Sequence, residues 1–261
     1  MTQIISTHSF RGGTGKSNIT ANLAALLARR GHRVGVFDTD IQSPGIHVIF
    51  NLAEDEIRLT LNDYLWGNCS IEEATYQVQN ENGGAVFLVP SSIKANDIAR
   101  VLREKYDAND MHDAFRSLIS AFRLDYLLID THPGLNEETL LSIAISDKLI
   151  IVLRPDRQDF QGTSVTVDVA RRLRVPHISL VINKIPPEFN FADVQRQVEE
   201  TYDCDVAALL ALSTDLAENA SSSLFCLEHP DHPFTAGVEQ IVALCEMEGV
   251  VPAGLNGQAA D

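Results

Sequence analysis

The sequence has few cysteines, and their arrangement excludes two kinds of site. Its 261 residues include four, scattered without a Cys-x-x-Cys pair: Cys69, Cys204, Cys226 and Cys245. This pattern predicts reduced thiols rather than a disulfide framework or a cysteine-bound metal. Long apolar runs are also missing, so we expect no segment that spans a bilayer. Met1-Thr2-Gln3 lacks the basic region that begins a signal peptide, and the sequence therefore predicts a cytoplasmic protein.

Basic residues are scarce as well. Lysine and arginine total 20 against 36 aspartates and glutamates, which gives a formal net charge of −16. Proteins that bind DNA without sequence preference gain most of their affinity from basic side chains on phosphates, so direct DNA binding is disfavoured here but not excluded. Residues 249–261 contain no lysine or arginine, which does not fit a basic amphipathic membrane anchor. We expect a protein partner or adaptor instead.

The remaining composition suits one large α/β domain. Hydrophobic residues make up 45% of the chain, enough for a substantial core, and we expect one domain over residues 1–248 with a flexible tail over 249–261. We expect Cys69–Gly84 to be turn-rich and the sole tryptophan, Trp66, to pack in the core. Predicted strands are Gln3–Thr7, Arg33–Asp38, Ala85–Pro90, Asp125–Asp130, Lys148–Leu153, Ile178–Lys184 and Val206–Leu212. Predicted helices are Asn18–Arg30, Lys94–Lys105, Asp110–Phe122, Gln161–Leu173, Phe191–Thr201, Asp215–Ser221 and Pro233–Glu248. Their alternation predicts a doubly wound, mainly parallel sheet.

The strongest motif is a glycine-rich stretch between the first predicted strand and helix. It reads Ser9-Phe10-Arg11-Gly12-Gly13-Thr14-Gly15-Lys16-Ser17. Glycines let backbone N–H groups converge on an anion, and the helix N-terminus adds its positive dipole end. In such a phosphate-binding loop Lys16 reaches the β- and γ-phosphates and Ser17 ligates Mg²⁺. Phe10 occupies the position of the first glycine in the usual spacing, so this is a variant loop. A plain helix-capping turn is the alternative, which the order strand, turn, Lys-Ser and helix disfavours.

Acidic residues follow two of the predicted strands. Asp38-Thr39-Asp40 ends one, and Asp130-Thr131-His132-Pro133-Gly134 ends another. Loops at the carboxyl ends of parallel strands form the ligand crevice of open α/β sheets. An apolar strand that ends in Asp130 has the Walker B arrangement, and Asp38 and Asp40 are suited to Mg²⁺-bound water and to an attacking water. An aspartate-rich turn without function is the alternative for Asp38 and Asp40. We interpret His132 as a structural or switch residue rather than as a general base.

The glycine-rich stretch resembles the deviant Walker A loop of the MinD/ParA family, whose pattern is K-G-G-x-G-K-[ST]. The match is residue for residue from Gly12 to Ser17, with Arg11 in place of the family's signature lysine. The resemblance covers most of the chain, from Gln3 to Glu248. It implies a P-loop NTPase fold and an ATPase that forms an ATP-sandwich homodimer and acts on a cargo through partner proteins. In the family the signature residue reaches the partner's phosphates; arginine keeps that charge and adds a planar fork.

The resemblance also implies roles for individual residues, with ATP or ADP and Mg²⁺ as cofactors. Asp40 is expected to position the attacking water, while Lys16 and Arg11 act on the phosphates. Asn183 follows a predicted strand and is expected to contact adenine. The implied nucleotide contacts are Arg11, Gly12, Gly13, Thr14, Gly15, Lys16, Ser17, Asn18 and Asn183, and the implied metal ligands are Ser17, Asp38 and Asp130.

Other readings stay open. The fold also suits a metabolic P-loop kinase or ligase, with Asp156, Arg157 and Asp159 at a strand end where a substrate site can lie. The third hypothesis is a nucleotide sensor that binds ATP without hydrolysing it. It stays open because Arg11 departs from the family pattern, and an arginine that is too long for this position would slow hydrolysis. Arg11 as a solvated loop residue is the plainest alternative.

Overall fold

A computed structural model describes residues 2–104 and 108–247. Its strands are β1 Gln3–His8, β2 Arg33–Asp38, β3 Tyr76–Glu81, β4 Gly84–Val89, β5 Tyr126–Asp130, β6 Lys148–Leu153, β7 His177–Ile185 and β8 Asp205–Ala211. Its helices are α1 Lys16–Arg29, α2 Ile46–Ile49, α3 Leu61–Leu65, α4 Ala95–Arg103, α5 Ala108–Phe122, α6 Glu137–Ala144, α7 Arg157–Arg172, α8 Phe191–Tyr202, α9 Thr214–Asn219, α10 Phe225–Glu228 and α11 Pro233–Met247. Within these ranges no helix is long and apolar enough to cross a membrane.

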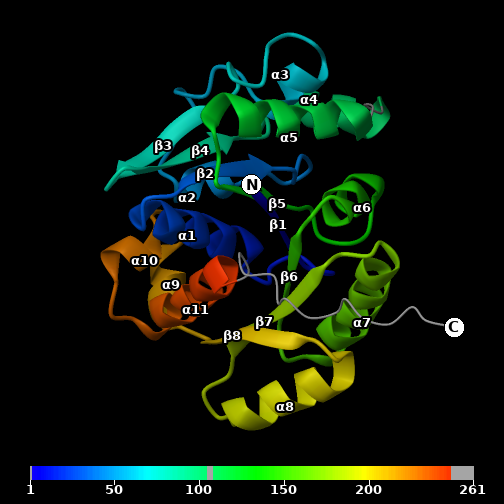
Figure 1. The fold of residues 1–261 in the computed structure, drawn as a ribbon, viewed down its shortest axis with the longest axis vertical. Coiled ribbons are helices and arrows are strands. Elements are labelled where there is room, and N and C mark those ends of the chain that lie inside the picture. The colour runs from blue at the N-terminus through cyan, green and yellow to red at the C-terminus, as the bar shows by residue number, and fades with distance from the viewer. Residues whose placement is uncertain (1, 105–107, 248–261) are drawn as a thin grey trace, which may run out of the picture.

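The strands form one sheet in the order β3-β4-β2-β5-β1-β6-β7-β8. All neighbours are parallel except β3 and β4. Helices cover both faces, with α1 and α11 on one side and α5, α7 and α8 on the other (Figure 1). The predicted doubly wound, mainly parallel sheet is therefore confirmed.

The core is divided by the sheet because each central strand is buried on both faces. In β6, Ile150 and Val152 pack under α1 and α11, whereas Leu149 and Ile151 pack under α7 and α8. Successive strand side chains point to opposite faces, so a strand covered on both sides reads as a continuous apolar run. This is why the central strands could be read from the sequence to within one or two residues.

The central strands bring three loops together at their carboxyl ends. β1 leads into the glycine-rich stretch, and its neighbour β5 and the next strand β2 lead into the two aspartate loops. Their register sets Thr7 and Asp38 each opposite Asp130. Parallel pairing thus aligns three chain segments that are far apart in sequence, at the sheet edge where α/β proteins bind ligands.

Some elements were not predicted. β3 lies in the stretch expected to be turn-rich; it is an edge strand, Tyr76-Gln77-Val78-Gln79-Asn80-Glu81, whose apolar alternation covers only Tyr76 and Val78 before polar residues end it. The start of α7 was placed four residues too late, because the Asp156 side chain caps it by accepting from the backbone N–H of Gln158 and Asp159.

The expected core role of Trp66 was wrong. The residue is only partly buried, and the guanidinium of Arg100 lies 4.3 Å from its ring centroid. This is a cation–π contact between α4 and the end of α3, so the indole covers an arginine rather than filling the core. The predicted helix ends at Lys105 and Glu248, and the tail 249–261, lie outside the described residues.

Candidate nucleotide site

The glycine-rich stretch folds as a tight loop against the N-terminus of α1. Gly13 and Gly15 have φ of +77° and +96°, a conformation that favours glycine. An added Cβ at Gly15 would lie 2.5 Å from Nδ2 of Asn183. Helix α1 starts at Lys16, so its unpaired N–H groups open toward the loop. This arrangement can hold an anion by backbone donors and the helix dipole.

Two side chains from the end of β7 support the loop. Asn183 is buried, its Nδ2 donates to the Thr14 carbonyl at 2.7 Å, and its Oδ1 accepts from the Lys184 backbone N–H at 2.8 Å. Lys184 Nζ donates to the Gly13 carbonyl at 2.8 Å. Asn183 therefore fixes the loop, and its contact with adenine stays a prediction. Lys184 was missed, although the Asn-Lys pair at the end of an apolar strand was visible in the sequence.

Asn18 contacts the turn after α9. Its Nδ2 donates to the hydroxyl of Ser221 at 3.0 Å, which links α1 to the turn after α9. Ser221 has a left-handed φ of +60° and follows Ala220 at +49°. Asn18 therefore links α1 to this turn. Its predicted contact with the nucleotide stays a prediction.

Asp130 lies beside the start of α1. It is 1% exposed, and burial raises its pKa to about 6, against the favourable charge of Lys16 and the nearby hydroxyls of Ser17 and Thr20. Lys16 itself is only 7% exposed. The predicted residues Lys16, Ser17 and Asp130 are therefore brought together.

Asp38 is the second buried carboxylate. Its Oδ1 accepts from the Asp40 backbone N–H at 3.1 Å. Burial raises its pKa well above the usual value, and the charges of Asp130 and Asp40 raise it further. Among the described residues, Asp38 Oδ2 and Asp130 Oδ1 are buried without a hydrogen-bond partner. Unpaired buried carboxylates are costly unless a cation accompanies them, so this pair fits Mg²⁺.

The donor set also indicates how a metal would be held. Carboxylate and hydroxyl oxygens suit Mg²⁺, which keeps several waters and phosphate oxygens and needs only one or two protein carboxylates. In the described ranges no three His, Cys, Asp or Glu side chains form a cage for a metal ion. The residues therefore fit a magnesium ion that arrives with a nucleotide rather than a metal held by protein alone.

Asp40 and His132 join the two aspartate loops. His132 Nδ1 lies 2.6 Å from Asp40 Oδ1, with side chains 22% and 15% exposed. Asp40 Oδ1 also accepts from the Ser43 backbone N–H at 3.1 Å. Asp40 is thus held at the rim of the site, beside the buried pair Asp38 and Asp130.

His8 is a buried site residue that sequence reasoning passed over. Its Nδ1 lies 2.8 Å from the Thr131 hydroxyl, which itself donates to the Thr7 carbonyl. Since that hydroxyl proton is already used, His8 Nδ1 is the donor and Nε2 carries a lone pair. Burial lowers the pKa of His8 to about 3, helped by the charges of Lys16 and His132. His8 is therefore neutral at physiological pH.

Arg11 lies against its own chain. Its Nη1 is 3.9 Å from Asp156 Oδ1 and 3.7 Å from Asp159 Oδ1, and its side chain is 42% exposed. Arg154 holds Asp159 in a two-pronged contact, with Nε and Nη2 at 2.9 and 3.2 Å from the carboxylate oxygens. Arg11 is therefore not a purely solvated loop arginine. The contact of Arg11 with a partner's nucleotide stays a prediction.

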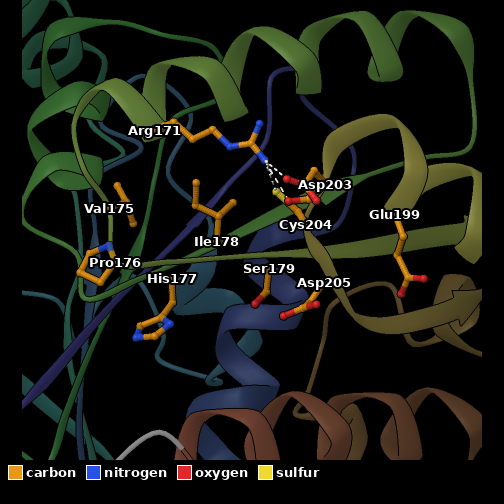
Figure 2. A pocket seen from close by; sticks show the side chains of 10 residues that line it. All are labelled: Arg171, Val175, Pro176, His177, Ile178, Ser179, Glu199, Asp203, Cys204 and Asp205. Atoms are coloured by element: carbon orange, nitrogen blue, oxygen red, sulfur yellow. Dashed lines mark hydrogen bonds and ion pairs between the residues drawn. The ribbon is translucent and has the colours of Figure 1, made fainter. Parts of the chain in front are cut away.

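A cavity of the described part of the chain lies elsewhere. It has a volume of about 580 Å³ and is lined by residues at the amino ends of β7 and β8, among them His177, Ser179 and Asp205 (Figure 2). Arg171 points across it to Asp203 and Cys204. The glycine-rich loop lies at the opposite end of the sheet, so this cavity is separate from the candidate site.

Comparison with known proteins identifies the family. A family model described as an AAA domain matches residues 2–177. The chain belongs to this family. An uncharacterized ATP-binding protein of Methanocaldococcus jannaschii is 28% identical over 236 residues, which span 90% of this chain and 84% of that protein. The septum site-determining protein MinD of Synechocystis is 26% identical over 215 residues, 82% of this chain and 77% of the relative.

The fold of this AAA domain protein also matches a solved structure. MinD of Pyrococcus horikoshii, complexed with Mg-ADP, superposes with a TM-score of 0.79 at 22% identity, over 94% of this chain and 96% of that one. Together, the family match, the relatives and the fold show that the chain is a member of the MinD/ParA-like P-loop ATPases. The predicted resemblance and the predicted P-loop NTPase fold are confirmed.

Proposed function

We propose that this protein binds and hydrolyses ATP with Mg²⁺, and that its ATP-bound form is a sandwich homodimer that positions or regulates a cargo. The observation that carries the proposal is the meeting of the glycine-rich loop with two buried carboxylates that have unpaired oxygens. The glycine-rich loop suits a phosphate group, and the two carboxylates suit a divalent cation.

In this proposal the loop residues Gly12 to Ser17 and the start of α1 hold the phosphates. Lys16 contributes a buried charge beside Asp130. Ser17, Asp38 and Asp130 hold Mg²⁺, directly or through its waters. When bound, Mg²⁺ neutralises phosphate charge during transfer.

For hydrolysis, the chain's own residues position and stabilise rather than form covalent bonds. Asp40 orients the attacking water from the rim of the site, where His132 and the Ser43 backbone N–H hold its carboxylate. Lys16 and a partner's Arg11 stabilise the charge that develops on the phosphoryl oxygens. Turnover is expected to be slow without a partner, because Arg11 lies on Asp156 and Asp159 in the single chain.

The partners follow from charge and from the relatives. A net charge of −16 disfavours direct non-specific DNA binding, so a protein adaptor in the cytoplasm is the proposed connection to a cargo. Relatives that are septum site-determining proteins support a role in positioning. The described residues also contain no membrane-spanning helix.

Phosphate release and nucleotide affinity, measured together, test the activity. Wild type is expected to bind Mg²⁺-ATP and release phosphate slowly. Lys16→Ala is expected to lose at least about tenfold in affinity, the equivalent of one buried charge-assisted contact of 1.4 kcal/mol or more. Asp40→Ala is expected to bind normally and to release less phosphate. Tight binding with no phosphate release in wild type would contradict hydrolysis and favour a nucleotide sensor, and phosphate transfer to a small molecule would favour a kinase.

A further inference from the structure

His132 connects the Asp40 loop to the glycine-rich loop. The Gly134 backbone N–H donates to the Ser9 carbonyl at 3.1 Å, which ties the loop after β5 to the first residues of the glycine-rich stretch. Two residues earlier, His132 Nδ1 meets Asp40 Oδ1 at 2.6 Å. A short hydrogen-bonded path therefore runs from Ser9 to Asp40 across three strands, β1, β5 and β2, which are neighbours in the sheet.

The direction of the His132 contact follows from its chemistry. An ionised carboxylate can only accept, so His132 Nδ1 donates to Asp40. An imidazole is a rigid, planar donor with two side-chain torsions, and a charge-assisted hydrogen bond of this kind is short and strong. The bond restricts the Asp40 side chain to one orientation, with the Ser43 backbone N–H as the second donor on the same oxygen.

Exposure separates this pair from the buried carboxylates. Asp38 and Asp130 are each 1% exposed, whereas the side chains of Asp40 and His132 are 15% and 22% exposed. Among the described residues, Asp40 Oδ1 takes part in hydrogen bonds and Oδ2 in none. One carboxylate oxygen is thus anchored and the other is available at the rim of the site, which suits a group that must orient a water molecule.

We propose that His132 is a positioning residue for ATP hydrolysis, holding the Asp40 carboxylate in register with the glycine-rich loop. This inference rests on the proposed function and deepens it, because it names the residue through which the phosphate loop sets the orientation of Asp40. His132 does not touch the reacting atoms in this proposal. It acts through Asp40 alone, so its removal leaves nucleotide affinity intact and lowers turnover.

The test compares four variants of the full chain with wild type. His132→Ala removes the donor, and His132→Asn keeps one, since Asn Nδ2 and His Nδ1 are both bonded to Cγ. Asp40→Ala and the double variant show whether the two residues act as a unit. We expect His132→Ala to lower kcat by roughly 10- to 100-fold, the range for a displaced catalytic group, with KM and ATP affinity within about twofold. His132→Asn should recover most of the loss, and the double variant should be no slower than Asp40→Ala.

A second measurement does not depend on hydrolysis. The Ser43 backbone N–H donates to Asp40 Oδ1 at 3.1 Å and to the Asp40 carbonyl at 3.2 Å. Its amide hydrogen exchange therefore reports the side-chain bond together with the turn that Asp40 begins, and loss of the side-chain bond should speed it. We expect faster exchange at Ser43 in His132→Ala and wild-type exchange in His132→Asn. Unchanged exchange in His132→Ala, or losses in kcat that add in the double variant, would overturn the inference. Failure of the proposed function would instead appear as an absence of phosphate release in wild type.

Discussion

His8 has a buried imidazole whose ionisation should be visible in stability. Its pKa is about 3 in the folded chain and 6.5 for an ordinary histidine. Between these values the unfolded chain takes up a proton that the folded chain does not, so the free energy of unfolding falls as pH is lowered. One such group changes stability by up to about 1.4 kcal/mol per pH unit.

Replacing His8 by asparagine tests this cause. His8→Asn keeps a donor for the Thr131 hydroxyl but cannot titrate. We expect the variant to lose less stability than wild type between pH 7 and pH 5, by about 1–2 kcal/mol, in denaturant unfolding measured at both pH values. Equal losses in the two proteins would show that His8 is not the group that titrates.

Gly162 in α7 is required by the neighbouring Phe10. An added Cβ would lie 2.1 Å from Cδ1 of the Phe10 ring, so alanine cannot be accommodated without a shift. We expect Gly162→Ala to lower the free energy of unfolding by roughly 1–3 kcal/mol, despite the better helix propensity of alanine.

The double variant Phe10→Ala/Gly162→Ala identifies the source of that cost. Without the ring, the added methyl meets no such clash, and Gly162→Ala should then be neutral or stabilising relative to Phe10→Ala. Gly45→Ala is the control, because a Cβ there meets nothing within 4 Å. If Gly162→Ala costs the same with and without Phe10, the contact with the ring does not explain it.

At the scale of elements, the N-terminus of α7 holds Arg11. Asp156 caps α7 and lies 3.9 Å from Arg11, so Asp156→Asn keeps a capping side chain while removing one negative charge. We expect the variant to form the ATP-dependent dimer at an ATP concentration up to about fivefold lower than wild type needs. This is the effect expected from the loss of a partly exposed ion pair. The half-saturating ATP concentration for dimer formation measures this.

A charge removed elsewhere provides the matched control. Asp193 pairs with Arg196 on the exposed surface of α8, so Asp193→Asn should leave the half-saturating concentration unchanged. The difference between the two variants should shrink at high salt, because exposed charges are screened. An Asp156→Asn variant that needs as much ATP as wild type would mean that Arg11 is not restrained by this contact.

The same elements show how far sequence reasoning reached. The loop from Gly12 to Ser17 and the strands before Asp38 and Asp130 were predicted, because local pattern and burial on both sheet faces determine them. The edge strand β3 was missed, since its apolar alternation stops after Val78 and gives too short a burial signal. The contacts of Arg11 with Asp156 and Asp159, and of Asp40 with His132, join segments distant in sequence, and only the strand order and register bring them together.

At the scale of the whole molecule, charge opposes association. Two copies that each carry −16 repel, so a dimer needs favourable contacts at the nucleotide to offset this. In the proposed function those contacts come from Arg11, the nucleotide and Mg²⁺ at the carboxyl edge of the sheet. Dimer formation should therefore depend on the nucleotide rather than occur in all states.

Solution mass by light scattering tests this central claim most directly. The chain has a mass of 28.7 kDa, and we expect this mass without nucleotide and with Mg²⁺-ADP, and twice this mass with Mg²⁺-ATP. The ATP-dependent dimer should persist longer in Asp40→Ala, because hydrolysis is slowed. A single mass in all three conditions, whether monomer or dimer, would contradict nucleotide control of assembly.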